Sequence, residues 1–167
     1  MGTVLYECTD AFSFSFLGCF LFSAGFYYAK RKLAASENVH DQVLWFIMGL
    51  CTAFAIFFGA IMLVEEIDQY NKIVVAYQEG NYQIVEGYVE NFHTTMDDDR
   101  DMDAFEINGI SFEYSSSWDM HGYHYASAHG GVITGDGQHL RIGYITMDSA
   151  TGNQMLDNVI VYIEALP

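Results

Sequence analysis

The sequence predicts a membrane protein of mixed α and β structure, in which a two-helix transmembrane hairpin precedes a small antiparallel β-domain. Two uncharged apolar segments in the first 64 residues predict the helices, and short alternating segments separated by turn residues predict the β-domain. The charge is divided in the same way. The chain of 167 residues has 22 acidic and 6 basic side chains, and 18 acidic and three basic side chains lie in residues 65–167.

Composition excludes two broad classes of protein. Binding to nucleic acid requires a surface rich in Lys and Arg, which six basic residues against a net charge of −16 do not supply. A disordered chain is excluded because 51% of the residues are hydrophobic and 16% are aromatic, which is enough to bury a core.

Each apolar segment is long enough to cross a membrane. Residues 11–29 and 43–64 contain 19 and 22 residues without a charge, and a helix rises 1.5 Å per residue across a hydrocarbon layer of roughly 30 Å. The first segment differs from a secretory signal peptide, because its basic residues follow the apolar run instead of preceding it. We therefore expect two membrane-spanning helices.

The basic residues predict the orientation of this hairpin. Lys30, Arg31 and Lys32 lie in the connection 30–42, which the positive-inside rule places in the cytoplasm. Both termini are then extracytoplasmic, and the protein is a multi-pass protein of the cytoplasmic (inner) membrane. Small residues four apart in the second span favour packing of the two spans on each other, and assembly into oligomers stays open.

The region after the second span predicts a short helix and then strands. Residues 65–79 continue as a juxtamembrane helix, and residues 80–167 form an extracytoplasmic acidic domain. Asn108-Gly109 between two alternating segments is a strong hairpin signal. The alternation predicts an outward face with Glu106, Ser111 and Glu113, and an inward face with Phe105, Ile107, Ile110, Phe112 and Tyr114. The expected strands are 82–92, 105–107, 110–114, 131–134, 140–147 and 158–165. Strands this short and numerous predict a small barrel of the OB or SH3-like kind, or a curled antiparallel sheet.

Four turn and strand motifs lie within roughly residues 82–165, about half of the chain. They are Val85-Glu86-Gly87, the segment from Phe105 to Ser115, Gly130-Gly131-Val132-Ile133, and Leu140-Arg141-Ile142-Gly143-Tyr144. Together they resemble a bacterial family of small, often membrane-attached β-domains without an assigned activity. The resemblance implies the β fold and a bacterial source, and it implies no site.

An acidic segment is the first candidate metal site. Asp99, Asp101 and Asp103 alternate as the first ligands of a calcium loop do. The second half of that loop is missing, since Ala104 stands at the position of the required Gly and Ile110 at that of the bidentate Glu. A solvated acidic loop over residues 97–103 is the favoured interpretation, and binding of a calcium ion is the alternative.

Histidines form the second candidate. His121, His124 and His129 lie close together in the sequence, with His139 further along, and imidazoles bind zinc. No helix aligns them, so exposed histidines without a metal are favoured, and no cofactor is expected. A third interpretation is pH sensing, in which the charge of these histidines changes with external acidity.

The segment after the predicted hairpin has the composition of a recognition loop. Trp118, Tyr123 and Tyr125 stand among serines and glycines, and rigid aromatic side chains surrounded by small polar residues are typical of binding loops. These three are the predicted partner contacts. The alternative is that the tyrosines belong to the core of the β-domain.

No enzyme motif is present, and we expect no catalytic activity. The sequence favours a non-enzymatic, membrane-anchored extracytoplasmic module that binds a protein, one that is basic because the domain is acidic. Immunity to a secreted toxin or an accessory role in an envelope complex would fit. The alternative is a sensor of divalent cations or pH that uses residues 97–103 and 121–139.

Overall fold

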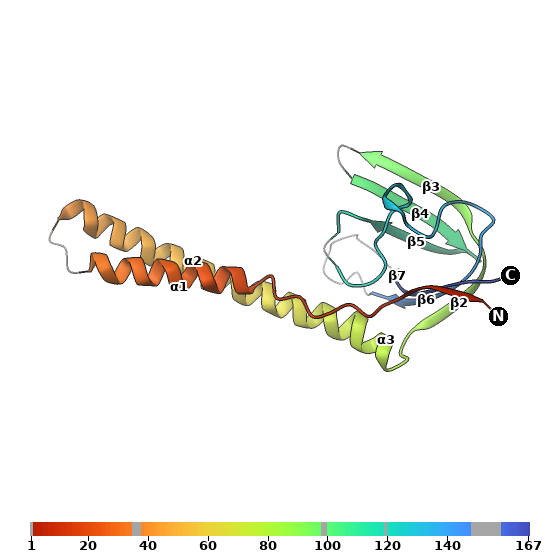
Figure 1. Cartoon of the computed structure of the whole chain (residues 1–167), viewed down its shortest axis with the longest axis horizontal. Coiled ribbons are helices and arrows are strands. Elements are labelled where there is room, and N and C mark those ends of the chain that lie inside the picture. The colour runs from red at the N-terminus through yellow and green to blue at the C-terminus, as the bar shows by residue number, and fades with distance from the viewer. Residues whose placement is uncertain (1, 35–37, 98–99, 119, 148–157) are drawn as a thin grey trace. The chain divides into compact units, whose positions relative to one another are not determined.

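A computed structural model describes residues 2–34, 38–97, 100–118, 120–147 and 158–167 (Figure 1). The chain forms two compact units, Ala11–Asp68 and Met1–Asp10 together with Gln69–Pro167. In chain order the elements are β1 (Thr3–Glu7), α1 (Leu17–Leu33), α2 (Val39–Tyr70), the π-helical turn η1 (Asn71–Val75), α3 (Ala76–Gln78), β2 (Gln83–Tyr88), β3 (Glu90–Asp97), β4 (Arg100–Ile107), β5 (Ile110–Ser115), the 3-10 turn η2 (Ser127–His129), β6 (His139–Thr146) and β7 (Asn158–Ala165).

Among the described helices, one is long and apolar enough to cross a membrane, and it runs over Val39–Gln78. The first helix is shorter than the sequence predicts. It begins at Leu17, and its 17 residues extend for about 26 Å. The preceding segment alternates Phe and Ser, which is not a helical pattern, and Ser13 N donates a hydrogen bond to Glu66 Oε1 at 2.6 Å.

Helices α1 and α2 lie side by side in Figure 1, and their side chains meet near both ends of α1. The Cys19 thiol lies 3.9 Å from the Met62 sulfur, and Lys30 Nζ lies 4.1 Å from the centre of the Trp45 ring. A residue early in α1 thus meets one late in α2, and the reverse holds at the other end, so the helices are antiparallel. Gly59 permits this approach, because a Cβ there would lie 3.1 Å from the Cβ of Cys19.

The second unit contains two antiparallel sheets. Sheet A has the strand order β1-β7-β6-β2, and sheet B has the order β3-β4-β5. The antiparallel character is confirmed, and the closed OB or SH3-like barrel is wrong. The chain leaves sheet A at Val89, whose N–H and C=O bond to Gln138 and Gly137, so the single strand expected over 82–92 becomes β2 and β3 in different sheets.

Two further segments differ from the sequence-based division. Residues 1–64 were expected to form one membrane unit, but Thr3–Glu7 pairs with β7 at the edge of sheet A, with Thr3 opposite Ala165. Residues 131–134 were expected to be a strand and are irregular. There the Gln138 side chain accepts from Thr134 N at 2.7 Å and donates to Val132 O at 3.0 Å, which replaces strand pairing.

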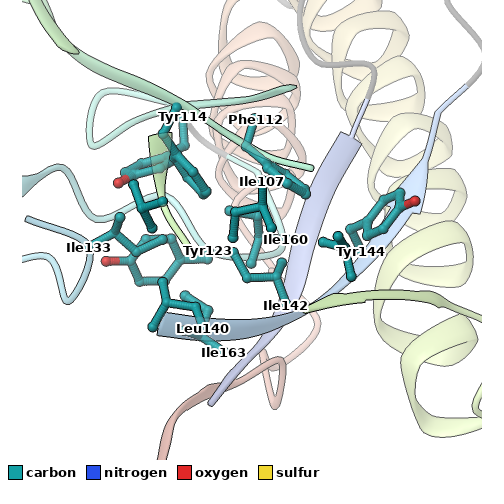
Figure 2. Close-up of a cluster of buried hydrophobic side chains, with 13 residues drawn as sticks. Ile107, Phe112, Tyr114, Tyr123, Ile133, Leu140, Ile142, Tyr144, Ile160 and Ile163 are labelled. Carbon is teal, nitrogen blue, oxygen red and sulfur yellow. The ribbon is translucent and has the colours of Figure 1, made fainter. Parts of the chain in front are cut away.

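The core of this unit lies between the two sheets. Figure 2 shows aromatic and aliphatic side chains from both sheets gathered in one cluster, which we call the inter-sheet core. Its fully buried members include Phe105, Ile107, Phe112, Tyr114, Leu140, Ile142 and Ile163. A second cluster forms where η1 packs on β7, with Ile73 and Val74 against Val159 and Val161.

Candidate interaction surface

Tyr123, one of the three predicted partner contacts, is a core residue. Its side chain is only 5% exposed, and its ring lies 5.1 Å from both Tyr6 and Tyr114. Its hydroxyl accepts a hydrogen bond from Val132 N at 2.7 Å, and burial raises the pKa of Tyr123. Tyr123 therefore offers no surface to a partner. For this residue the alternative interpretation, that the tyrosines belong to the core of the β-domain, is the correct one.

The other two predicted contacts differ from each other. Trp118 is half-buried and packs against the inter-sheet core. Tyr125 is 50% exposed, and its ring stacks on that of His124 with centroids 4.7 Å apart. Of the three residues, Tyr125 is the one that presents an aromatic face to the surroundings.

The described residues of the acidic segment 97–103 lie in strands β3 and β4 and not in a free loop. Asp97 ends β3 and is paired with Arg100 at the start of β4, while Asp99 lies outside the described residues. Asp101 is in β4, opposite Met96.

The carboxylate of Asp103 is completely buried. It accepts hydrogen bonds from the Thr94 hydroxyl at 2.8 Å and from Ser127 N at 2.6 Å. It is therefore an internal structural group, and the prediction that Asp103 belongs to a solvated acidic loop is wrong.

The three predicted histidine ligands have separate environments. His121 is 7% exposed and its Nδ1 lies 3.8 Å from Asp10 Oδ2, whereas His124 Nδ1 lies 2.9 Å from Gly122 O. His129 is exposed at the end of η2. Within the described part of the chain, no group of three His, Cys, Asp or Glu side chains is placed to hold a metal ion.

Asp10 is a polar residue that the sequence did not single out. Its Oδ2 accepts from Gly122 N at 2.9 Å and from the Cys8 thiol at 3.7 Å, in addition to its contact with His121. Cys8 is fully buried, and burial together with the nearby Asp10 raises the pKa of its thiol to about 11. A thiol in this environment is protonated at neutral pH and is not an activated nucleophile.

One Arg bridges two carboxylates on sheet A. Arg141 on β6 donates to Glu86 on β2 at 2.9 Å and to Glu164 on β7 at 2.8 Å. The hydrogen bond to Glu86 and the charge of Glu164 raise the pKa of Arg141. These three residues are directly opposite one another in the sheet, so both carboxylates beside Arg141 have a cationic partner within the protein.

Sheet B carries a groove of about 270 Å³ whose acidic side chains lack such a partner. It is lined by Asn91, His93, Ala104, Phe105, Glu106, Ser111, Phe112, Glu113 and Asn158, which include no Lys or Arg among the described residues. His93, Ala104 and Glu113 are opposite one another on β3, β4 and β5. The small side chain of Ala104 between two larger ones leaves the sheet face hollow.

Sequence reasoning had placed Glu106, Ser111 and Glu113 on the outward face of the hairpin without assigning them a role. The signal was the strict alternation of residues 105–114. The alternation did not predict that His93 lies on the same face, because the pairing of β3 with β4 includes a register shift between Glu90 and His93. Asn91, which lies within that shift, has a positive φ of 56°, and the sequence did not predict this conformation.

No family model, curated protein or solved structure matches this chain. The similarity to a bacterial family of β-domains therefore stays a prediction, and the function is argued from the geometry.

Proposed function

We propose that the protein is a non-enzymatic module that a two-helix transmembrane hairpin anchors outside the cytoplasmic membrane, where its acidic β-domain binds a basic protein. The pairing of β1 with β7 is the observation that supports anchoring by two helices. The negative charge of the β-domain supports a basic partner.

The strand pairing constrains how the chain meets a membrane. Because Thr3–Glu7 pairs with Asn158–Ala165, residues 1–10 and 69–167 lie on the same side of any membrane. The segment between them, 11–68, then crosses an even number of times. Residues 39–68, the part of the apolar helix Val39–Gln78 that lies in this segment, are suited to one crossing, and in our proposal α1 and the residues before it supply the second. The six residues 11–16 add up to about 20 Å to the 26 Å of α1, which is ample for a layer of roughly 30 Å.

Basic and aromatic residues support the orientation. Lys30, Arg31 and Lys32 occupy the last turn of α1, with Lys30 over the Trp45 ring and Lys32 Nζ 5.1 Å from the Tyr28 ring. Lys and Arg near membrane helices favour the cytoplasmic side, and aromatic rings favour the membrane interface. The β-domain with both chain ends is then extracytoplasmic.

The charge of the β-domain supports a basic partner. Residues 1–10 and 69–167 contain 17 acidic and three basic side chains, a net charge of −14. A field of this sign accelerates the approach of basic proteins and disfavours acidic ones, and it is screened beyond about 8 Å at physiological salt. Immunity to a basic toxin and assembly with a basic envelope protein are both consistent with this chemistry.

Purification of the full chain from its native membranes tests the proposal. We expect the protein to stay in the membrane fraction after an alkaline carbonate wash. We also expect the co-purified protein to be basic and to be released by about 0.5 M salt, which shortens the Debye length to a few Å. Recovery of the chain in the soluble fraction, or of a partner that is acidic and salt-resistant, would contradict it.

His121 favours a second function, the sensing of external pH. Its buried ring contacts Asp10 just before the helical unit, and lies 5.6 Å from the ring of Tyr70 just after that unit. A proton on His121 would convert the contact with Asp10 into an ion pair at this position. If the free energy of unfolding changes equally between pH 5 and 8 in the wild type and in His121→Gln, this second function is ruled out.

A further inference from the structure

The groove on sheet B has two glutamates, Glu106 and Glu113, among its lining residues. Glu106 is fixed at its edge, because Asn91 Nδ2 donates to one carboxylate oxygen at 3.1 Å and the Ser111 hydroxyl to the other at 3.4 Å. Glu113 is exposed on the neighbouring strand. A carboxylate whose position is already fixed by hydrogen bonds needs little reordering when a ligand binds.

The positions of the two glutamates match the reach of one guanidinium group. Glu113 is opposite Ala104, and Glu106 is two residues further along β4 on the same face. Such diagonal neighbours are about 7–8 Å apart, within reach of a single long side chain between them. The planar guanidinium group, with five N–H donors, is suited to bridging carboxylates, whereas an ammonium group is a compact point charge.

Sheet A of the same protein contains an arginine between two glutamates, Arg141 between Glu86 and Glu164. The register differs, because both of those glutamates are directly opposite Arg141, whereas on sheet B Glu113 is opposite Ala104 and Glu106 is on the same strand as Ala104. Sheet B has two carboxylates and, above Ala104, the space for a long side chain, but the described residues that line the groove include no Lys or Arg.

We infer that the groove over Ala104 binds an arginine side chain of the basic protein partner, which bridges Glu106 and Glu113. The inference rests on the proposed function and assigns the site through which that function acts.

Binding of a fluorescein-labelled hexa-arginine peptide to the full chain in nanodiscs tests the inference, with a hexa-citrulline peptide as the uncharged control. Fluorescence anisotropy gives Kd. Glu106→Gln combined with Glu113→Gln is compared with Glu7→Gln combined with Glu79→Gln, which removes the same charge from exposed sites elsewhere on the unit. We expect the groove pair to weaken binding at least about tenfold and the control pair less than about threefold, because charge-assisted hydrogen bonds are lost only in the first.

A second pair of variants changes the groove without changing the charge. Ala104→Leu fills the hollow, and Ala128→Leu places the same side chain on the exposed η2 turn. We expect only Ala104→Leu to weaken peptide binding, with circular dichroism spectra unchanged in both.

The outcomes separate the two proposals. Equal weakening by the two glutamine pairs overturns the arginine site and leaves the acidic domain as a diffuse attractor of basic partners. Equal binding of hexa-arginine and hexa-citrulline overturns the basic partner as well.

Discussion

The carboxylate of Asp103 is the polar group that joins sheet B to the segment after β5. It is fully buried and links Thr94 on β3 with the backbone of Ser127. A buried carboxylate is tolerated only when hydrogen bonds replace its hydration, and these two bonds do so. The residue therefore stabilises the fold and is not available to a cation.

Asp103→Ala is predicted to lower the free energy of unfolding of the β-domain by about 2 kcal/mol, because it removes the buried acceptor of two hydrogen bonds, from the Thr94 hydroxyl and from Ser127 N. Urea unfolding followed by Trp118 fluorescence in a Trp45→Phe protein measures this change. Glu113→Ala, on the exposed face, is the control and should cost less than about 0.5 kcal/mol. Added calcium should change neither value, and stabilisation by millimolar calcium that disappears in Asp103→Ala would restore the metal site.

The raised pKa of Cys8 predicts that the β-domain loses stability at alkaline pH. Burial raises its pKa from 9.0 to about 11, so the folded thiol keeps its proton at a pH where the unfolded thiol loses it. The stability from this group is complete below pH 9 and falls as the pH rises towards 11.

We expect the decline in unfolding free energy from pH 8 to pH 10 to be about 1 kcal/mol smaller in Cys8→Ala than in the wild type. Urea unfolding at the two pH values measures it, with Cys51→Ala in the helical unit as control. Buried Tyr6, Tyr114 and Tyr123, whose pKa values are also raised, add to the decline in all three proteins. Identical slopes in Cys8→Ala and the wild type would contradict the assignment.

At the residue scale, the sequence predicts burial that follows from a local pattern and misses burial that depends on a contact with a distant part of the chain. The alternation of residues 105–114 correctly placed Phe105, Ile107, Phe112 and Tyr114 in the core. Tyr123 packs against Tyr6, which lies more than a hundred residues earlier in the chain. The composition of the segment around Tyr123 contains no information on this packing, so the sequence predicted a contact residue at Tyr123.

At the scale of elements, the segment between β5 and β6 is fixed by a glycine that no larger residue replaces. Gly122 has a φ of 96°, and a Cβ there would lie 2.6 Å from Val159 Cγ1 and 3.0 Å from Ile160 O on β7. Tyr123 N donates to the same Ile160 O at 2.8 Å. The backbone thus lies directly on β7 at this position.

Gly122→Ala is predicted to cost about 3 kcal/mol or more, from both the backbone conformation and the collision. Gly130→Ala is the matched control, because Gly130 has a similar φ of 85° and a Cβ there meets no described atom within 4 Å. It should cost only about 1 kcal/mol, the penalty of the left-handed conformation alone. Equal losses in thermal unfolding would show that the close approach to β7 does not matter.

The sequence predicted the elements whose signals are local. Asn108 and Gly109, both with positive φ, form the turn between β4 and β5 as expected, and β7 covers the expected residues. Strand β1 was missed because its partner β7 is about 150 residues away, and a five-residue segment next to an apolar run has no pattern of its own. The division of residues 82–97 between two sheets was missed because β2 and β3 are separated only by Val89.

At the scale of the whole molecule, the pairing of β1 with β7 connects both ends of the helical segment to one folded unit. A β-domain on a single span would be attached at one point and would leave the N-terminal residues on the other side of the membrane. Here Met1–Asp10 and Gln69–Pro167 belong to one unit, and the hairpin that we propose is consistent with both the strand pairing and the apolar helix.

Protease treatment of intact bacterial spheroplasts that express the full chain tests this topology most directly. Antibodies against a C-terminal tag and against a tag inserted in the connection 30–42 follow the two parts separately. The account predicts that the C-terminal tag is removed from intact spheroplasts, while the tag in 30–42 is degraded only after lysis. Protection of the C-terminal tag until lysis, or loss of both tags from intact spheroplasts, would contradict it.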